Sequence, residues 1–140
     1  MKTLFPAFRV SDLAVALEFY TALGYDTLGH VDLGAGVHLA MLAFPEEPAV
    51  SLELVHRPGG DPVTPGGCDH LAVQVDDLDA TRERLRVSGL EPGDVKLPGG
   101  LEGPRAVWLV DPDGHRIELV QWPPGHPVGM TRADFPDNPS

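Results

Sequence analysis

The sequence predicts an α+β fold made of two related βαβββ units that follow one another along the chain. Three short segments recur at one constant offset of 65 residues, which is the distance from Glu53 to Glu118. Each pair keeps its character: a strand with a central glutamate, the start of a helix, and the end of a helix. The pairs are Leu52-Glu53-Leu54-Val55 with Ile117-Glu118-Leu119-Val120, Val10-Ser11-Asp12-Leu13 with Val75-Asp76-Asp77-Leu78, and Gly24 with Gly89. Units related in this way usually pack about a pseudo-twofold axis, because neither buries its apolar face alone.

The first unit begins with an apolar strand over residues 4–10, in which Pro6 favours an edge strand or a bulge. Ser11 and Asp12 supply the N-cap of a helix, and Gly24 is typical of its left-handed C-cap. Between these caps, apolar residues recur on one helical face: Leu13, Leu17, Tyr20 and Leu23. Turn-forming residues then separate three predicted strands, over residues 25–31, 37–44 and 50–56.

The second unit repeats this order. A strand is predicted over residues 70–75 and a helix over 77–89. Three strands follow, a weak one near residues 94–97 and stronger ones over 106–110 and 116–121. The turn Asp111-Pro112-Asp113-Gly114 joins the last two strands, and His115 beside it is expected to face solvent.

These elements divide the chain into one domain and a tail. Residues 1–57 form the first unit and residues 68–122 the second, and the proline- and glycine-rich residues 58–67 are interpreted as the linker between them. Residues 123–140 are predicted to form an irregular C-terminal extension, in which His126 has no assigned role.

The composition predicts a cytoplasmic protein that binds no nucleic acid. The 140-residue chain of 15.0 kDa carries a formal net charge of −11 and has a pI near 4.7, so its surface would repel phosphates. No segment approaches the roughly 20 apolar residues of a membrane span, and the N-terminus lacks the apolar core of a signal peptide. The single Cys68 agrees with a reducing compartment and is expected to be a small core residue.

Three residues carry the clearest chemical signal. Side chains alternate along a strand, so Glu53 and Glu118 point away from their apolar neighbours, toward solvent, an interface or a cavity. The 65-residue offset also maps Phe5 onto His70. A glutamate on an exposed sheet face is common, and a lone strand histidine is usually an ordinary polar residue. If the pseudo-twofold axis brings equivalent positions together, however, Glu53, His70 and Glu118 form a ligand set suited to a divalent metal.

Several local sequences carry a family resemblance when they are taken in order. They are Arg9-Val10-Ser11-Asp12-Leu13, Phe19-Tyr20, Leu23-Gly24, Gly67-Cys68-Asp69-His70-Leu71-Ala72 and the run from Asp111 to Leu119. Over residues 4–121 the chain resembles the vicinal oxygen chelate superfamily, which includes glyoxalase I, bleomycin-resistance proteins, fosfomycin-resistance enzymes and extradiol dioxygenases. The resemblance implies that the units form a curved, cup-like mixed sheet with the helices outside. It also implies a homodimer.

The resemblance implies roles for five residues. Glyoxalase I enzymes hold their metal with four ligands, and Glu53, His70 and Glu118 match three of them. The fourth position is Phe5, which cannot bind a metal. The dioxygenases and fosfomycin enzymes need a histidine there, so Phe5 counts against both. Arg9 matches an arginine that grips a carboxylate of the substrate, which suits a guanidinium group.

Two functions follow from this resemblance. In the first, a divalent ion such as zinc or nickel is held by Glu53, His70 and Glu118, and Glu118 or Glu53 moves a proton on a small α-hydroxycarbonyl or thiol adduct. The chain would then be a glyoxalase-like lyase or isomerase. In the second, no metal is bound because Phe5 replaces a ligand, and the chain is a small-molecule binding protein of the bleomycin-resistance type. Phe5 then forms an apolar wall, and the carboxylates recognise a cationic ligand.

Overall fold

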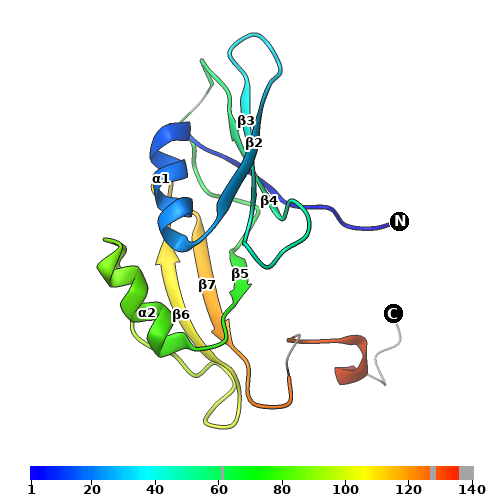
Figure 1. The fold of residues 1–140 in the computed structure, drawn as a ribbon, viewed down its shortest axis with the longest axis vertical. Coiled ribbons are helices and arrows are strands. Elements are labelled where there is room, and N and C mark those ends of the chain that lie inside the picture. Colours follow the sequence, from blue (N-terminus) through cyan, green and yellow to red (C-terminus); the bar gives the residue numbers. More distant parts are fainter. Residues whose placement is uncertain (61, 127–128, 136–140) are drawn as a thin grey trace.

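The computed structural model describes residues 1–60, 62–126 and 129–135. Seven strands and two α-helices follow one another in the predicted order, except that one of the eight predicted strands does not form (Figure 1). The first half contains β1 (Ala7–Arg9), α1 (Leu13–Leu23), β2 (Asp26–Asp32), β3 (His38–Ala43) and β4 (Leu52–His56). The second half contains β5 (Leu71–Gln74), α2 (Leu78–Val87), β6 (Arg105–Val110) and β7 (Arg116–Gln121). The predicted α+β fold class is therefore confirmed.

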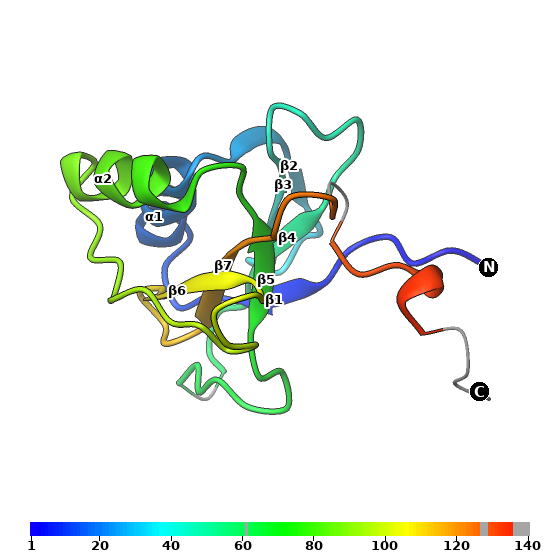
Figure 2. The same ribbon diagram turned by 90° about the horizontal axis from the view of Figure 1, so that it is seen from below.

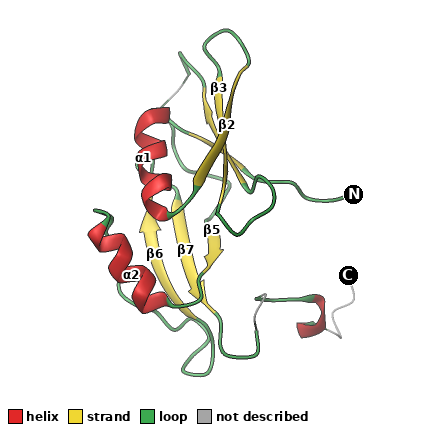
Figure 3. Cartoon of the chain, in the orientation of Figure 1, coloured by secondary structure: helices red, strands yellow, loops and turns green. Residues whose placement is uncertain are grey.

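The strands form two separate sheets (Figure 3). The first sheet has the order β1-β4-β3-β2 and the second has the order β5-β7-β6. In each sheet the first strand of the half pairs in parallel with its last strand, and the remaining pairs are antiparallel. The strand expected near residues 94–97 is wrong: only a single bridge, between Lys96 and Ala106, forms there. Pro92 and Gly93 precede this segment and Pro98 and Gly99 follow it, which leaves too short a run for a strand.

Each helix begins at an aspartate cap, which the sequence predicts for α1. The Asp12 side chain accepts a hydrogen bond of 3.1 Å from the Val15 N–H at the start of α1, and Asp77 caps α2 by accepting one of 2.9 Å from Ala80 N–H. Gly24 ends α1 with a φ of 128°, a conformation that side chains with a Cβ rarely adopt. Both helices lie on one side of the sheets (Figure 2).

Side chains of the second half fix it against the first half. Arg84 of α2 donates hydrogen bonds of 3.3 and 2.8 Å to the carbonyls of Ala22 and Leu23, at the C-terminal end of α1. These carbonyls lack partners within the helix, and a cation is favourable at this end of a helix dipole. Buried residues from both halves form one hydrophobic cluster, including Tyr20, Leu54, Leu85 and Ile117. The halves therefore share a core inside one chain.

The core leaves one face of each sheet uncovered by helices. In β7, Ile117 and Leu119 are buried, whereas Glu118 between them and Arg116 before them point to the other face. In β4, Leu52 and Leu54 are likewise buried on either side of Glu53, which is partly exposed. Both predicted glutamates therefore lie on a sheet face that is open to a ligand or to another chain.

The segment after β7 is not wholly irregular. A short 3₁₀ helix, Arg132–Asp134, has a capping box between Thr131 and Asp134. Part of the predicted extension, residues 127–128 and 136–140, lies outside the described residues, as does residue 61 of the predicted linker. A bilayer-spanning helix needs about 20 apolar residues, and none of the described helices has that length and hydropathy.

Candidate metal and substrate site

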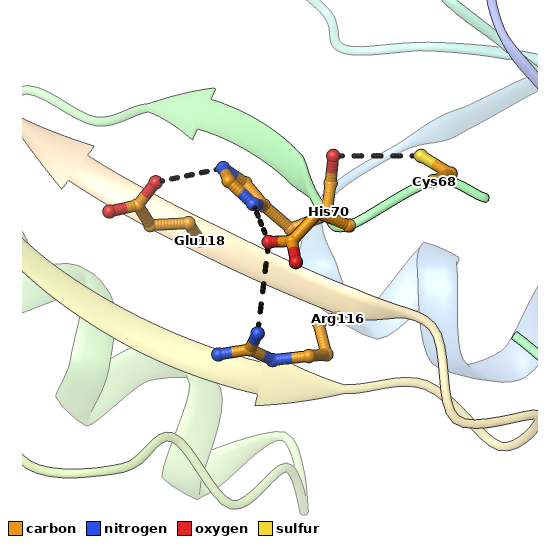
Figure 4. A network of polar contacts seen from close by, with 5 residues as sticks. Cys68, His70, Arg116 and Glu118 are labelled. Carbon is orange, nitrogen blue, oxygen red and sulfur yellow. Dashed lines mark hydrogen bonds and ion pairs between the residues drawn. The ribbon is translucent and has the colours of Figure 1, made fainter. Parts of the chain in front are cut away.

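His70 and Glu118 converge on the open face of the second sheet. The His70 Nε2 atom lies 3.3 Å from a carboxylate oxygen of Glu118 (Figure 4). The Glu118 side chain is only 16% exposed and that of His70 is 33% exposed, so the pair is sheltered but reachable. An imidazole nitrogen and a carboxylate oxygen at this separation are ligands of the kinds that zinc and similar ions prefer.

Asp69 holds the other side of the His70 ring. The Nδ1–H of His70 donates a hydrogen bond of 2.6 Å to the Asp69 carboxylate, because a carboxylate can only accept. This hydrogen bond lowers the pKa of Asp69 below its usual range, and the nearby positive charge of Arg116 adds to the effect. Arg116 Nη1 lies 3.8 Å from the same Asp69 oxygen.

Trp108 completes the surroundings of His70. The Arg116 guanidinium lies over the Trp108 ring, 4.2 Å from its centroid. The His70 and Trp108 rings meet edge to face, with centroids 4.9 Å apart. Trp108 is also the residue of β6 directly opposite Glu118. His70 thus contacts an anion, an aromatic ring and the proposed ligand Glu118.

The first sheet repeats this arrangement with different side chains. Ala7 stands opposite Glu53 exactly as Ala72 stands opposite Glu118, which confirms the 65-residue offset. Phe5 comes two residues before Ala7, as His70 comes two residues before Ala72. On the other side of Glu53 lies Met41 of β3, where Trp108 lies beside Glu118. One half therefore offers an imidazole and a carboxylate, and the other offers a carboxylate among apolar residues.

A single chain does not gather the whole predicted ligand set. Across residues 1–60, 62–126 and 129–135, no three side chains of His, Cys, Asp or Glu are grouped so that they could hold a metal ion. Glu53 of the first sheet is therefore not grouped with His70 and Glu118 at the second sheet within these described residues. The structure brings two of the three predicted ligands together.

Arg9 lies at the end of β1, next to the linker. Its guanidinium packs so closely on Gly60 that a Cβ there would come within 2.0 Å of it. The Arg9 carbonyl accepts a hydrogen bond of 2.9 Å from Nε2 of His115, whose ring stacks on Phe8. His115 is therefore partly buried, and the expectation that it faces solvent is wrong, because the turn folds back against β1.

Arg9 also borders a hollow of about 220 Å³ between β1 and the linker. His115 and Cys68 line this hollow too, whereas His70 and Glu118 do not. Cys68 is exposed, so its expected core position is wrong. It precedes β5 instead of lying within that strand.

Comparison with known proteins decides the family. The profile of the Glyoxalase/Bleomycin resistance protein/Dioxygenase superfamily matches residues 4–119. The chain belongs to this superfamily. Its relatives include a probable lactoylglutathione lyase of Synechocystis, 35% identical over 119 residues, which span 81% of this chain and 89% of the relative.

Two solved structures share the fold of this chain. The trypanothione-dependent glyoxalase I of Leishmania major matches with a TM-score of 0.69 and 27% identity, over 86% of each chain. TnmS3, an antibiotic-binding protein from Streptomyces sp. CB03234, matches with a TM-score of 0.69 and 26% identity, over 87% of this chain and 97% of TnmS3. A glyoxalase I and an antibiotic-binding protein thus match this chain with the same TM-score.

The sequence did not reveal Asp69, Arg116 and Trp108 as parts of the site. Trp108 could have been found by counting register outward from the predicted turn, since Trp108 and Glu118 are equidistant from Asp113. Asp69 and Arg116 offered no such signal. Their contact joins the segment before β5 to the start of β7, and only the pairing of these strands brings them together.

Proposed function

We propose that the chain is a glyoxalase-like, metal-dependent lyase or isomerase that acts on a small α-hydroxycarbonyl or thiol adduct. The observation that carries this proposal is the approach of His70 Nε2 to Glu118, 3.3 Å apart on the open face of the second sheet. The relatives of this chain that are named lactoylglutathione lyase support the same class of reaction.

One chain supplies only part of the ligand set that a divalent ion needs. His70 and Glu118 would hold it from the second sheet, and Glu53 is the remaining carboxylate of the set. When bound, such an ion would act as a Lewis acid on adjacent oxygens of the substrate. The two ligands of one chain leave room for further ligands, so the site would be incomplete without a third protein group.

We propose that a second copy of the chain supplies Glu53. In a twofold-symmetric homodimer, the open face of the first sheet of one copy would meet the open face of the second sheet of the other. Each of the two sites would then contain Glu53 and Phe5 from one copy and His70 and Glu118 from its partner. In this arrangement each copy contributes one cytoplasmic domain, residues 1–122, with residues 123–140 as an extension.

The chain's own groups would then carry out the proton transfer. The isomerisation of an α-hydroxycarbonyl adduct moves a proton between two neighbouring carbons, and a carboxylate beside both carbons can take it up and return it. Glu118 or Glu53 has this role. Phe5 would pack against apolar parts of the substrate, and Arg9 would pair with a substrate carboxylate.

Metal analysis of the purified protein tests the proposal most directly. The protein is loaded with Ni²⁺ or Zn²⁺, dialysed, and examined by elemental analysis beside a Glu118→Gln variant. We expect close to one ion per proposed site in the wild type and a large loss in the variant, because an amide is a weak ligand. Wild-type protein that retains no ion would contradict the proposal.

A metal-free binding protein is the second candidate. The apolar surroundings of Glu53, with Phe5 at the position equivalent to His70 and Met41 opposite, favour it. The similarity to the antibiotic-binding protein TnmS3 supports it as well. In this case the two glutamates would recognise a cationic ligand, and that ligand would bind equally well in the presence of a chelator.

A further inference from the structure

We infer that Asp69 is a positioning residue that orients His70 toward its ligand, and that Arg116 and Trp108 brace it. The inference rests on the proposed metal site, in which His70 is a ligand, and it names residues that act through His70. Four contacts form a closed ring: His70 with Asp69, Asp69 with Arg116, Arg116 with Trp108, and Trp108 with His70.

The hydrogen bond from Asp69 selects which ring nitrogen is available. A neutral imidazole has one N–H and one bare nitrogen. The 2.6 Å contact with Asp69 is much shorter than the 3.3 Å contact with Glu118, so the proton of the neutral ring belongs on Nδ1. Nε2 then carries the free electron pair and points at Glu118. A carboxylate behind a ligating histidine is a recurring way to fix this geometry.

Arg116 and Trp108 hold Asp69 and the ring in place. The Asp69 side chain is 78% exposed, so on its own it would sample several rotamers. The Arg116 guanidinium lies between the Asp69 carboxylate and the Trp108 face, and it limits that freedom. The Trp108 edge in turn limits rotation of the His70 ring. An ion pair this exposed adds little to the stability of the fold, so its value lies in orientation.

The first half of the chain offers an internal comparison. The 65-residue offset maps His70 onto Phe5, Asp69 onto Leu4 and Arg116 onto Ser51. The half without the histidine therefore also lacks the carboxylate and the guanidinium. The Asp69–Arg116 pair accompanies the imidazole, as expected if its purpose is to position that ring.

Replacement of Asp69 tests the inference, with a matched control. Asp69→Ala removes the acceptor, Asp69→Glu restores a carboxylate, and Asp94→Ala removes another exposed aspartate paired with an arginine, Arg82, at 2.8 Å. Calorimetric titration of the whole protein with Ni²⁺ should show binding about 10- to 100-fold weaker for Asp69→Ala, in the range typical for groups that orient ligands. Asp69→Glu should recover part of this loss, Arg116→Gln should show a smaller loss, and Asp94→Ala should match the wild type.

A second measurement needs no metal. ¹⁵N NMR of the metal-free protein distinguishes the two neutral ring tautomers of His70. We expect Nδ1–H in the wild type and in Asp94→Ala, and a shift to Nε2–H in Asp69→Ala, where Glu118 becomes the only carboxylate partner. If no protein binds Ni²⁺ yet the tautomer still depends on Asp69, the proposed function fails and the inference stands. An Asp69→Ala variant with wild-type tautomer and Ni²⁺ affinity overturns the inference.

Discussion

The Tyr20 hydroxyl donates a buried hydrogen bond of 2.7 Å to the Asp111 carboxylate, across 91 positions of sequence. Tyr20 belongs to α1 in the first half, and Asp111 begins the turn after β6 in the second half. The other Asp111 oxygen accepts hydrogen bonds from the N–H groups of Asp113 and His115, at 2.9 and 2.8 Å. Asp111 therefore shapes its own turn and ties that turn to the opposite half.

We expect Tyr20→Phe to lower the free energy of unfolding by about 2 kcal/mol, because a hydrogen bond to a charged group contributes roughly 1.5–3 kcal/mol. Urea unfolding with an unchanged m-value measures this. Ser11→Ala is the control, since it removes a hydroxyl contact to Asp113 at an exposed site between the same halves. Equal losses in the two variants would show that the burial of the Tyr20 contact has no special effect.

The same tyrosine predicts a loss of stability in alkaline solution. Burial raises the pKa of Tyr20 far above its ordinary value, and the Asp111 carboxylate raises it further. The stabilisation that follows from a raised folded-state pKa is complete below the unfolded pKa of about 10 and is lost as pH rises above it. Wild-type protein should therefore lose unfolding free energy above that pH more steeply than Tyr20→Phe does. Urea titrations at a series of alkaline pH values test this, and parallel slopes would contradict it.

Most of the fold could be predicted because its signals are local. Asp12 caps α1 where the sequence places a cap, and the alternation around Glu53 and Glu118 gives the correct open faces. The strand expected near residues 94–97 does not form. Prolines and glycines on both sides of this segment leave only Lys96 to make a bridge. Where the sequence pattern was strong, it predicted the correct type of element. Where the pattern was weak, near residues 94–97, it predicted a strand that does not form.

Only part of the candidate site could be predicted from the sequence. The offset gives the equivalence of Phe5 and His70, and the structure agrees in register. The offset does not show whether the two open sheet faces meet within one chain. That depends on how the halves pack, through contacts such as those of Arg84 with Leu23 and of His115 with Arg9. These are long-range side-chain contacts, which no local pattern reveals.

Phe5→His should create the missing fourth ligand. A four-ligand zinc site contributes about 10–16 kcal/mol in total, so one added imidazole should tighten Ni²⁺ or Zn²⁺ binding by at least about tenfold, which corresponds to 1.4 kcal/mol. Calorimetric titration of the wild type and the variant measures the change. Phe5→Leu is the control, because it changes the shape of the side chain without adding a ligand. Unchanged affinity in folded Phe5→His would mean that residue 5 does not reach the metal.

Glu118→Gln should separate the enzyme from the binding protein. If Glu118 moves the proton, turnover of a thiol–methylglyoxal hemithioacetal should fall by about 10²–10⁴-fold, and a chelator should abolish wild-type turnover. Glu91→Gln, at an exposed position between α2 and β6, is the matched control. Absence of turnover in every metal-loaded protein, together with ligand binding that survives the chelator, would favour the metal-free function.

Mixing two inactive variants tests whether the site is shared between copies. One variant carries Glu53→Gln and the other carries His70→Ala with Glu118→Gln. If each site takes Glu53 from one copy and the other ligands from the second, a mixed twofold dimer contains one site in which all three ligands are replaced and one intact site.

Because random exchange makes half of the dimers mixed, unfolding and refolding the two variants together should restore about one quarter of wild-type activity and Ni²⁺ binding. Each variant refolded alone is the control and should stay inactive. A site built within one chain would recover nothing on mixing, since every chain would lack at least one ligand. Because Glu53 is not grouped with His70 and Glu118 within the described part of one chain, recovery is the expected result.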